Sequence, residues 1–208
     1  SLSFGATYSV SDGVGIAVGL SESNFLGRGQ YVALNISGGV DNKNSGFTFI
    51  EPAFLDRDLK FRFEGYYRTT DNQNSDYATK RYGAEIGFEF PTSEYGRLDL
   101  NYSASSSEIT SVDANSSIIL QADEARGAEV TSAVGYTYSY DTRTGGLDPN
   151  RGVLLRFSQD FAGVGGDIKS VTTTGLASYQ VKAFREEVTL RAEIEGGSGS
   201  FALHHFCH

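Results

Sequence analysis

The residues best suited to catalysis or metal binding gather at the C-terminus. His204, His205, Cys207 and His208 include every histidine and the single cysteine of the 208-residue chain. Imidazole and thiolate are donors that suit zinc or copper, and a serine nucleophile would have to recruit one of these histidines as its base. Chain termini are usually loose. We therefore interpret the cluster as an end segment, and we predict no metal site, no cofactor and no enzymatic activity.

Four carboxylates, Glu64, Glu85, Glu89 and Asp99, have the residue types that a general acid and base pair requires. Each of them has an arginine or lysine nearby on the same predicted strand face. Opposite charges on neighbouring strands stabilise one another as cross-strand pairs. The simpler prediction is therefore that these carboxylates form ion pairs across a wet face of a sheet.

The elements that must position these side chains are strands, because side chains alternate between apolar and small or polar along most of the chain. Leu2, Phe4, Ala6 and Tyr8, for example, share one face of the first segment. We predict no helix and about eleven strands, at residues 2–10, 13–20, 32–36, 47–49, 59–68, 81–90, 98–104, 128–140, 153–161, 168–179 and 188–194. The odd-numbered connections are polar and lengthen along the chain, up to residues 105–125, whereas most even-numbered ones are shorter.

Long loops at one end and shorter turns at the other are typical of up-and-down outer-membrane barrels. Alternation alone leaves open which face is wet. In a wide membrane barrel the polar face lines water, whereas in a soluble all-β domain the apolar face points inward. Eleven long strands enclose more room than apolar side chains fill, which favours the membrane barrel. The net charge of -9 argues against a nucleic-acid partner.

Four turn motifs, in order along the chain, resemble those of the bacterial outer-membrane insertase family, the BamA-like proteins. The first follows the strand Val-Gly-Ile-Ala-Val-Gly-Leu, and the second is an aromatic-x-Glu-Pro-x-Phe turn. The third reads Tyr-Asp-x-Arg followed by Pro-x-x-Gly, and the fourth is Gly-Gly-Asp. The matching residues are Asn24, Phe25, Leu26, Gly27, Gly29, Glu51, Pro52, Asp141, Arg143, Pro149, Gly152, Gly165, Gly166 and Asp167. Their types suit turn architecture, and Gly27 and Gly29 are expected to have positive φ.

The resemblance implies a non-enzymatic protein that assembles or translocates other outer-membrane proteins in a Gram-negative outer membrane. Its partners would be the lipid bilayer and unfolded outer-membrane protein strands. The first strand would act as the family's lateral-gate edge through Ser3, Phe4, Gly5, Ala6, Thr7, Tyr8, Ser9 and Val10. A passive pore and a soluble all-β binding domain are the alternatives.

Family barrels have about sixteen strands and follow periplasmic POTRA repeats. The resemblance therefore covers the N-terminal two-thirds of a barrel, without those repeats. We expect barrel strands over residues 1–195 and a tail of uncertain structure over residues 196–208. An incomplete barrel has two open edges, and hydrocarbon cannot satisfy their backbone groups. We therefore also expect a rearranged barrel or homo-oligomerisation through the edge strands.

Overall fold

The computed structural model describes residues 1–9, 13–39, 42–71, 76–143, 151–183 and 188–202. These residues form one antiparallel sheet of eleven strands, and neighbours in sequence are neighbours in the sheet. The strands are β1 (Leu2–Ser9), β2 (Gly13–Phe25), β3 (Gln30–Gly38), β4 (Asn42–Glu51), β5 (Lys60–Asp71), β6 (Ala78–Pro91), β7 (Gly96–Thr110), β8 (Glu129–Asp141), β9 (Arg151–Ala162), β10 (Lys169–Ala183) and β11 (Val188–Ala202).

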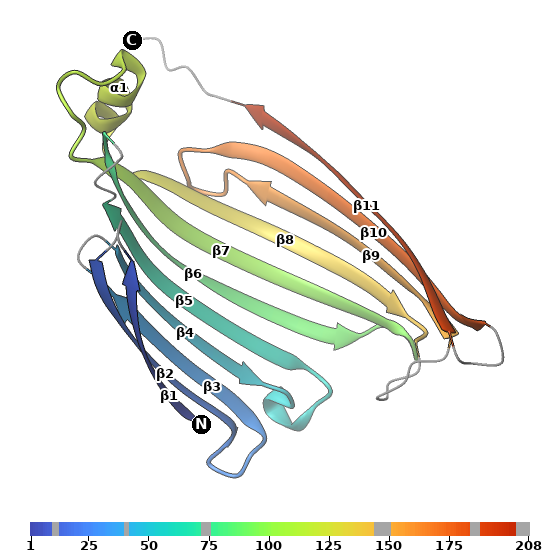
Figure 1. Ribbon diagram of the computed structural model, residues 1–208. Coiled ribbons are helices and arrows are strands. Elements are labelled where there is room, and N and C mark those ends of the chain that lie inside the picture. The colour runs from blue at the N-terminus through green and yellow to red at the C-terminus, as the bar shows by residue number, and fades with distance from the viewer. Residues whose placement is uncertain (10–12, 40–41, 72–75, 144–150, 184–187, 203–208) are drawn as a thin grey trace.

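The sheet curves into an open trough with β1 at one edge and β11 at the other (Figure 1). Within the described residues β1 pairs only with β2, and β11 pairs only with β10. The predicted all-β, antiparallel up-and-down fold of about eleven strands is confirmed. The sheet does not close on itself over this part of the chain.

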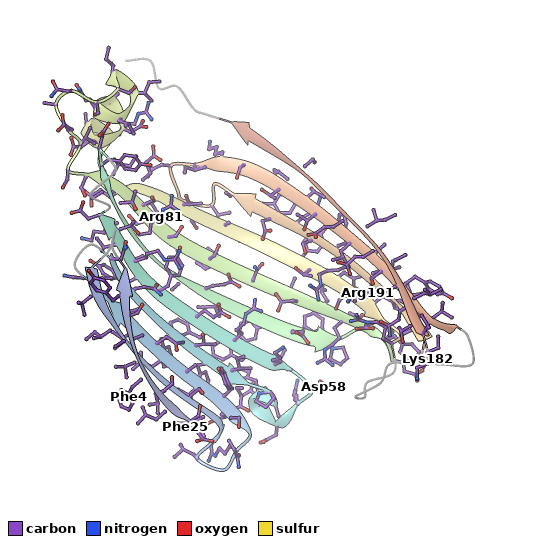
Figure 2. All side chains as sticks on the ribbon, viewed as in Figure 1. Phe4, Phe25, Asp58, Arg81, Lys182 and Arg191 are labelled. Atoms are coloured by element: carbon purple, nitrogen blue, oxygen red, sulfur yellow. The ribbon has the colours of Figure 1, made fainter. Side chains whose placement is uncertain are left out.

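Register assigns every side chain of the sheet to an apolar face or a polar face. One row of the apolar face runs from Leu20 through Leu34 to Phe47 on three successive strands. Phe4 belongs to the apolar face, whereas Arg81 and Arg191 belong to the polar face (Figure 2). The two faces therefore have opposite chemistry over the whole sheet.

The apolar face has no layer of the described chain packed against it. The buried apolar residues of the described chain are Ala33, Ala78 and Leu154, of which only Leu154 is large. A soluble sheet of this size would bury its large apolar side chains in a core. This one leaves them at its surface, as a sheet does when lipid covers that face.

Phenylalanine rings join the connection after β4 to the apolar face. The 3₁₀ turn η1 (Phe54–Asp56) places the Phe54 ring 5.3 Å from Phe61 and 5.9 Å from Phe88, measured between ring centroids. Phe61 and Phe88 are cross-strand partners with ring centroids 5.2 Å apart. Tilted and edge-on rings at these distances attract one another. The turn is thereby fixed at the margin of the apolar face.

The prediction of no helix was wrong in the connection between β7 and β8, where α1 (Ile118–Arg126) forms. Ser117 caps this helix by accepting a hydrogen bond from the Ile119 backbone N–H at 3.3 Å. Glu124 accepts a hydrogen bond from the Val112 backbone N–H at 3.1 Å, which ties the helix to the end of β7. Leu, Gln, Ala, Glu and Arg within α1 are good helix formers, and they outweigh the lack of an apolar stripe. None of the described helices has the length and apolar run that crossing a bilayer requires.

Several strands extend further than their apolar alternation indicates, and β7 and β11 gain the most residues. β7 runs to Thr110, six residues beyond its predicted end, because its serines pair with β6 and β8 and its last three residues pair with β6. β11 runs to Ala202, past residue 195, where the predicted barrel segment ended. Gly196 pairs with Gly175 and Ser198 with Thr173. Small residues carry no hydrophobic alternation, so backbone pairing with a neighbour decides their structure.

Candidate substrate-strand edge

The edge strand β1 is held to the sheet by an uninterrupted antiparallel register from Leu2 opposite Leu20 to Ser9 opposite Gly13. Apolar and β-branched residues of β2 line one face of this pair, with small residues on the other. Ser3 strengthens the pair, since its Oγ donates a hydrogen bond to the Gly19 carbonyl at 3.2 Å. The predicted edge residue Val10 lies outside the described residues.

Hydrogen bonds at the start of β1 show which backbone groups face β2. The Ser21 N–H donates to the Ser1 carbonyl at 2.8 Å, and the Ser1 amino group donates back to the Ser21 carbonyl. Ser1 and Ser21 are thus a hydrogen-bonded pair. Hydrogen-bonded and non-hydrogen-bonded pairs alternate in an antiparallel ladder. Ser3 and Gly5 therefore bond to β2, together with Thr7 and Ser9.

The remaining residues of β1 point their backbone N–H and C=O groups away from β2. They are Leu2, Phe4, Ala6 and Tyr8, which also carry the apolar side chains of the strand. Phe4 is 75% exposed and Tyr8 is 76% exposed. The edge thus offers backbone donors and acceptors at every second residue, flanked by apolar side chains. An added strand can bond to such an edge through main-chain groups alone.

The opposite edge has different chemistry. β11 carries Arg191, Glu193 and Glu195 on its polar face, whereas residues 1–9 contain no acidic or basic side chain. Arg191 forms an ion pair with Glu193 and donates a hydrogen bond from Nε to the Ser178 hydroxyl at 3.2 Å. Charged side chains on an edge strand discourage pairing with another chain. Of the two edges, β1 is therefore the better surface for strand addition.

The first two turn motifs lie side by side at one end of the sheet. Asn24 accepts a hydrogen bond at its Oδ1 from the Gly29 N–H at 2.7 Å, and its carbonyl accepts one from the Gly27 N–H at 3.0 Å. Gly27 and Gly29 have φ of 73° and 70°, so the predicted positive φ is confirmed at both. Glu51 accepts hydrogen bonds from the Ala53 N–H at 3.3 Å and from the Gln30 amide.

The third motif is an Asp–Arg fork at the same end of the sheet. The Asp141 carboxylate accepts hydrogen bonds from the Arg143 backbone N–H at 3.0 Å, from its Nε at 2.8 Å and from its terminal nitrogen at 2.6 Å. This bidentate pairing raises the pKa of the Arg143 guanidinium. A side chain at Gly152 would meet the Arg143 backbone at 2.6 Å, which explains a glycine there. Pro149 lies outside the described residues.

The fourth motif closes the connection between β9 and β10 at the other end. Gly165 has a φ of 85°, and a side chain at Gly166 would meet the Val130 carbonyl at 2.8 Å. Asp167 accepts a hydrogen bond from the Val130 N–H at 2.8 Å, while its own N–H donates to the Val130 carbonyl at 2.7 Å. The polar side chains of the motifs thus make contacts within turns or between a turn and a strand, as shown by Asn24, Glu51, Asp141, Arg143 and Asp167.

Ion pairs occupy the carboxylates of the polar face, as the sequence predicts. Arg62 contacts Glu85 at 2.8 Å and lies 3.7 Å from both Glu64 and Asp99. Glu89 contacts Lys60 at 3.1 Å and also pairs with Arg97. Carboxylates held by basic partners in this way are poorly suited to act as an acid and base pair. The arrangement fits a wet, charge-balanced surface.

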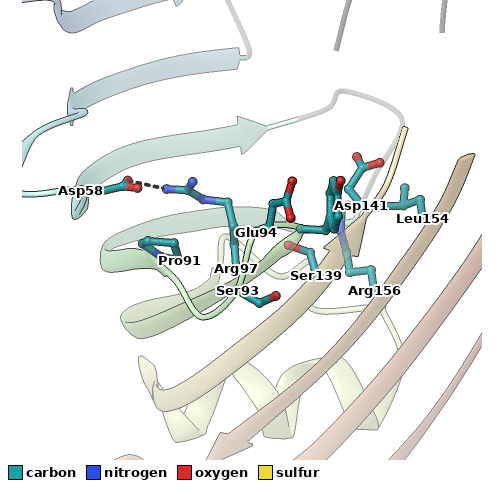
Figure 3. Close-up of a pocket in the computed structure, with 10 residues that line it drawn as sticks. Asp58, Pro91, Ser93, Glu94, Arg97, Ser139, Asp141, Leu154 and Arg156 are labelled. Carbon is teal, nitrogen blue, oxygen red and sulfur yellow. Dashed lines mark hydrogen bonds and ion pairs between the residues drawn. The ribbon is translucent and has the colours of Figure 1, made fainter. Parts of the chain in front are cut away.

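Two adjoining hollows follow this polar face toward the turns. The first, of about 450 Å³, lies between Asp58, Arg97, Asp141 and Arg156, and the Arg97–Asp58 ion pair of 3.1 Å crosses it (Figure 3). The second, of about 380 Å³, shares Ser139 and Arg156 with the first. At the rim, Glu94 accepts a hydrogen bond from Tyr95 and raises the pKa of that phenol. Mixed charges and hydroxyls make this surface suitable for water.

The described part of the chain contains no group of three or more histidine, cysteine, aspartate or glutamate side chains that could hold a metal ion. His204, His205, Cys207 and His208 lie outside the described residues, so their interpretation stays a prediction. The sequence placed the edge on the first strand but did not separate the residues with outward backbone groups, Leu2, Phe4, Ala6 and Tyr8, from their neighbours. Only the strand register separates them, because the direction of a backbone N–H depends on pairing and leaves no signal in residue type.

The sequence of the chain is similar to that of a known protein family. Residues 24–204 match the family model described as the Omp85 superfamily domain. The chain is 25% identical over 167 residues to the outer membrane protein assembly factor BamA of Nitratidesulfovibrio vulgaris, covering 78% of this chain and 20% of that protein. It is 23% identical over 199 residues to BamA of Neorickettsia risticii, covering 92% of this chain and 27% of that protein.

The fold has a counterpart among solved structures. The crystal structure of BamA from Haemophilus ducreyi lacking POTRA domains 1-3 superposes with a TM-score of 0.65 at 20% sequence identity. The match covers 95% of this chain and 41% of that one. The matched region thus spans less than half of each of these three chains.

Proposed function

Because the chain belongs to the Omp85 superfamily, we propose that it supplies membrane-spanning strands of a protein that assembles other outer-membrane β-barrel proteins. In this proposal β1 is the edge on which an incoming strand pairs. The relatives named as outer membrane protein assembly factors support the class of activity. Family and relatives also confirm the predicted outer-membrane location, and they disfavour the soluble alternative.

Backbone pairing carries the proposed mechanism. An incoming strand bonds to the N–H and C=O groups of Leu2, Phe4, Ala6 and Tyr8, which face away from β2. In hydrocarbon an unsatisfied backbone group costs several kcal/mol, so an open edge and an unpaired strand both gain by pairing. Backbone N–H and C=O groups are the same in every residue except proline, which lacks the N–H. One edge can therefore accept strands of many different proteins without a cofactor or a catalytic residue.

The side chains of β1 determine which residue types an incoming strand can place on the apolar and on the polar face of the sheet. A strand paired with β1 places its alternate residues beside Phe4 and Tyr8 on the apolar face, and the others beside the small residues Ser3 and Gly5. Membrane strands with an apolar-out, polar-in alternation satisfy both faces. The proposed substrates are therefore strands of outer-membrane barrels, held by the bilayer on one side and the wet polar face on the other.

The outward direction of alternate backbone groups on β1 is the observation that carries this proposal, and a proline at Ala6 tests it. Proline has no N–H, and it is tolerated on an edge strand where that N–H points away from the sheet. We expect Ala6→Pro to leave the barrel folded but to remove one backbone donor of β1, so that one carbonyl of the incoming strand loses its hydrogen bond. A neutral hydrogen bond contributes about 0.5–1.5 kcal/mol, which corresponds to roughly 2- to 12-fold weaker pairing.

The matched control is Ala6→Val, which adds bulk at the same position but keeps the N–H. Both variants are made in the full-length protein, reconstituted in vesicles, and assayed for the amount of protease-resistant outer-membrane substrate that they assemble. The proposal predicts slower assembly for Ala6→Pro and near-normal assembly for Ala6→Val. Unchanged assembly by a folded Ala6→Pro variant would show that this edge does not receive the substrate.

A further inference from the structure

Two adjacent turns of the sheet share a sequence that the proposed function does not use. The connection between β2 and β3 reads Phe25-Leu26-Gly27-Arg28, and the connection between β4 and β5 reads Phe54-Leu55-Asp56-Arg57. Both lie at the end of the sheet where the N-terminus is found (Figure 1). They are neighbours because β3 pairs with β4, and the Gln30 amide donates a hydrogen bond to Glu51 between them.

Each turn holds its leucine in an unfavourable conformation. Leu26 has a φ of 55° and Leu55 a φ of 57°, both in the left-handed region. That region costs a residue with a side chain roughly 1–2 kcal/mol, and glycine avoids the cost. Yet Leu26 is 77% exposed and Leu55 is 71% exposed, so neither side chain repays the cost by packing within the chain. Backbone strain without a packing reason is a sign of function.

A cavity of about 560 Å³ lies at these turns, lined by Arg28, Glu51, Ala53, Phe54, Leu55 and Asp56. It therefore brings one guanidinium together with two carboxylates and three apolar side chains. Within the described residues, neither Arg28 nor Asp56 has a side-chain hydrogen bond or ion pair. Glu51 has accepting capacity beyond its bonds to Ala53 and Gln30, since a carboxylate accepts about four.

The position of the cavity in the fold identifies the kind of ligand. Phe54 belongs to its lining and also packs on Phe61 and Phe88, which are apolar-face residues. The cavity thus borders the surface that meets lipid in the proposed function, at the level where strands give way to turns. Charged groups beside exposed apolar side chains at this level match the boundary between lipid headgroups and acyl chains.

We propose that this cavity binds the headgroup of a zwitterionic phospholipid that carries a primary ammonium group. Arg28 contacts the phosphate, and the carboxylates of Glu51 and Asp56 accept hydrogen bonds from the ammonium. Leu26, Leu55 and Phe54 contact the first part of the acyl chains. One cation with two anions suits a headgroup of both signs better than a purely anionic ligand. The inference rests on the proposed membrane placement of the apolar face.

The absence of tryptophan from the chain allows a direct test. Leu55→Trp introduces a single tryptophan beside the cavity, in the full chain reconstituted in vesicles, and its emission is distinct from that of the tyrosines. Phosphatidylethanolamine brominated close to its headgroup should quench this fluorescence. Arg28→Gln in the same background should raise the concentration of brominated lipid needed for half-maximal quenching roughly tenfold, because a charge-assisted contact is lost. Arg57→Gln is the matched control, because it removes the same charge from the same pair of turns but does not line the cavity.

Besides absence of quenching, three results would overturn the inference. They are quenching that does not respond to Arg28→Gln, equal quenching by brominated phosphatidylcholine, and displacement of the lipid by millimolar inorganic phosphate. The second result would indicate general contact with lipid, and the third a site for free anions. Leu26→Trp repeats the test if Leu55→Trp misfolds. A chain that never enters vesicles would refute the membrane placement itself, whereas one that enters and is not quenched refutes only this inference.

Discussion

An arginine in the middle of the apolar face should oppose membrane folding much more than an arginine on the polar face at the same level. Ile86 lies near the middle of β6, between its cross-strand partners Phe63 and Tyr102. Ser103 lies in the middle of β7 on the polar face, directly opposite Glu85. Ile86→Arg and Ser103→Arg thus introduce the same charge at nearby places on opposite faces.

The expected difference follows from the surroundings of each position. Arginine facing lipid near the bilayer midplane costs about 2–4 kcal/mol. That cost lowers the folding equilibrium constant by roughly 30- to 1000-fold for Ile86→Arg. An arginine at position 103 would stand in water beside Glu85, where exposed ion pairs change stability by only about 0–1 kcal/mol. The two variants should differ by at least tenfold.

Urea titration of folding into phosphatidylcholine vesicles measures this difference. Folded and unfolded forms are separated on a gel without boiling, and the midpoint and slope of each titration give the free energy of unfolding. Ile86→Ala distinguishes loss of the isoleucine side chain from gain of the charge. If Ser103→Arg proved as destabilising as Ile86→Arg, the assignment of the apolar face to lipid would be refuted.

Three further expectations concern the turns and the edges. Gly27→Val should destabilise the folded barrel by about 1–3 kcal/mol because the φ of Gly27 is positive. Gly46→Val is the control, since a side chain at Gly46 meets open space and its φ is not in the positive region. Equal losses of stability in the urea titration would contradict the explanation. Arg143→Gln should cost about 1 kcal/mol by breaking the fork to Asp141, while Arg28→Gln, which breaks no ion pair in the described chain, should leave unfolding unchanged. Edge-to-edge pairing predicts a dimeric mass in detergent that is lost in Ala6→Pro, and a strictly monomeric wild type would refute it.

Sequence patterns predicted the strands well where apolar residues alternate, as in β5 and β6, because burial on one face demands that period. They failed where small residues dominate. The serines at the end of β7 and the glycines of β11 look like loops but extend the ladder by pairing. α1 was missed because its hydrophobic pattern is weak, although Ser117 and the helix formers that follow it were visible in the sequence.

The candidate edge was only partly predictable for a related reason. The resemblance placed it on the first strand, and the alternation of Phe4, Ala6 and Tyr8 identified its apolar side chains. Residue types carry no information about the direction of a backbone N–H, which depends on the pair formed by Ser1 and Ser21. The cavity between the two neighbouring turns likewise required the pairing of β3 with β4.

Disulfide crosslinking between β1 and an arrested substrate tests the central claim most directly. Cys207 is first replaced by serine. Single cysteines are then introduced in β1, one residue at a time, and each variant is combined with substrates that carry one cysteine at successive positions of their terminal strand. Ser3 and Gly5 bond to β2, so an antiparallel substrate strand meets them as non-hydrogen-bonded pairs, with Cα atoms about 4.5 Å apart rather than about 5.5 Å. The account predicts stronger crosslinks at Ser3 and Gly5 than at Phe4 and Ala6, and none at Ala17, which β1 and β3 enclose. Crosslinks without this alternation, or crosslinks at Ala192 on β11 in place of β1, would contradict it.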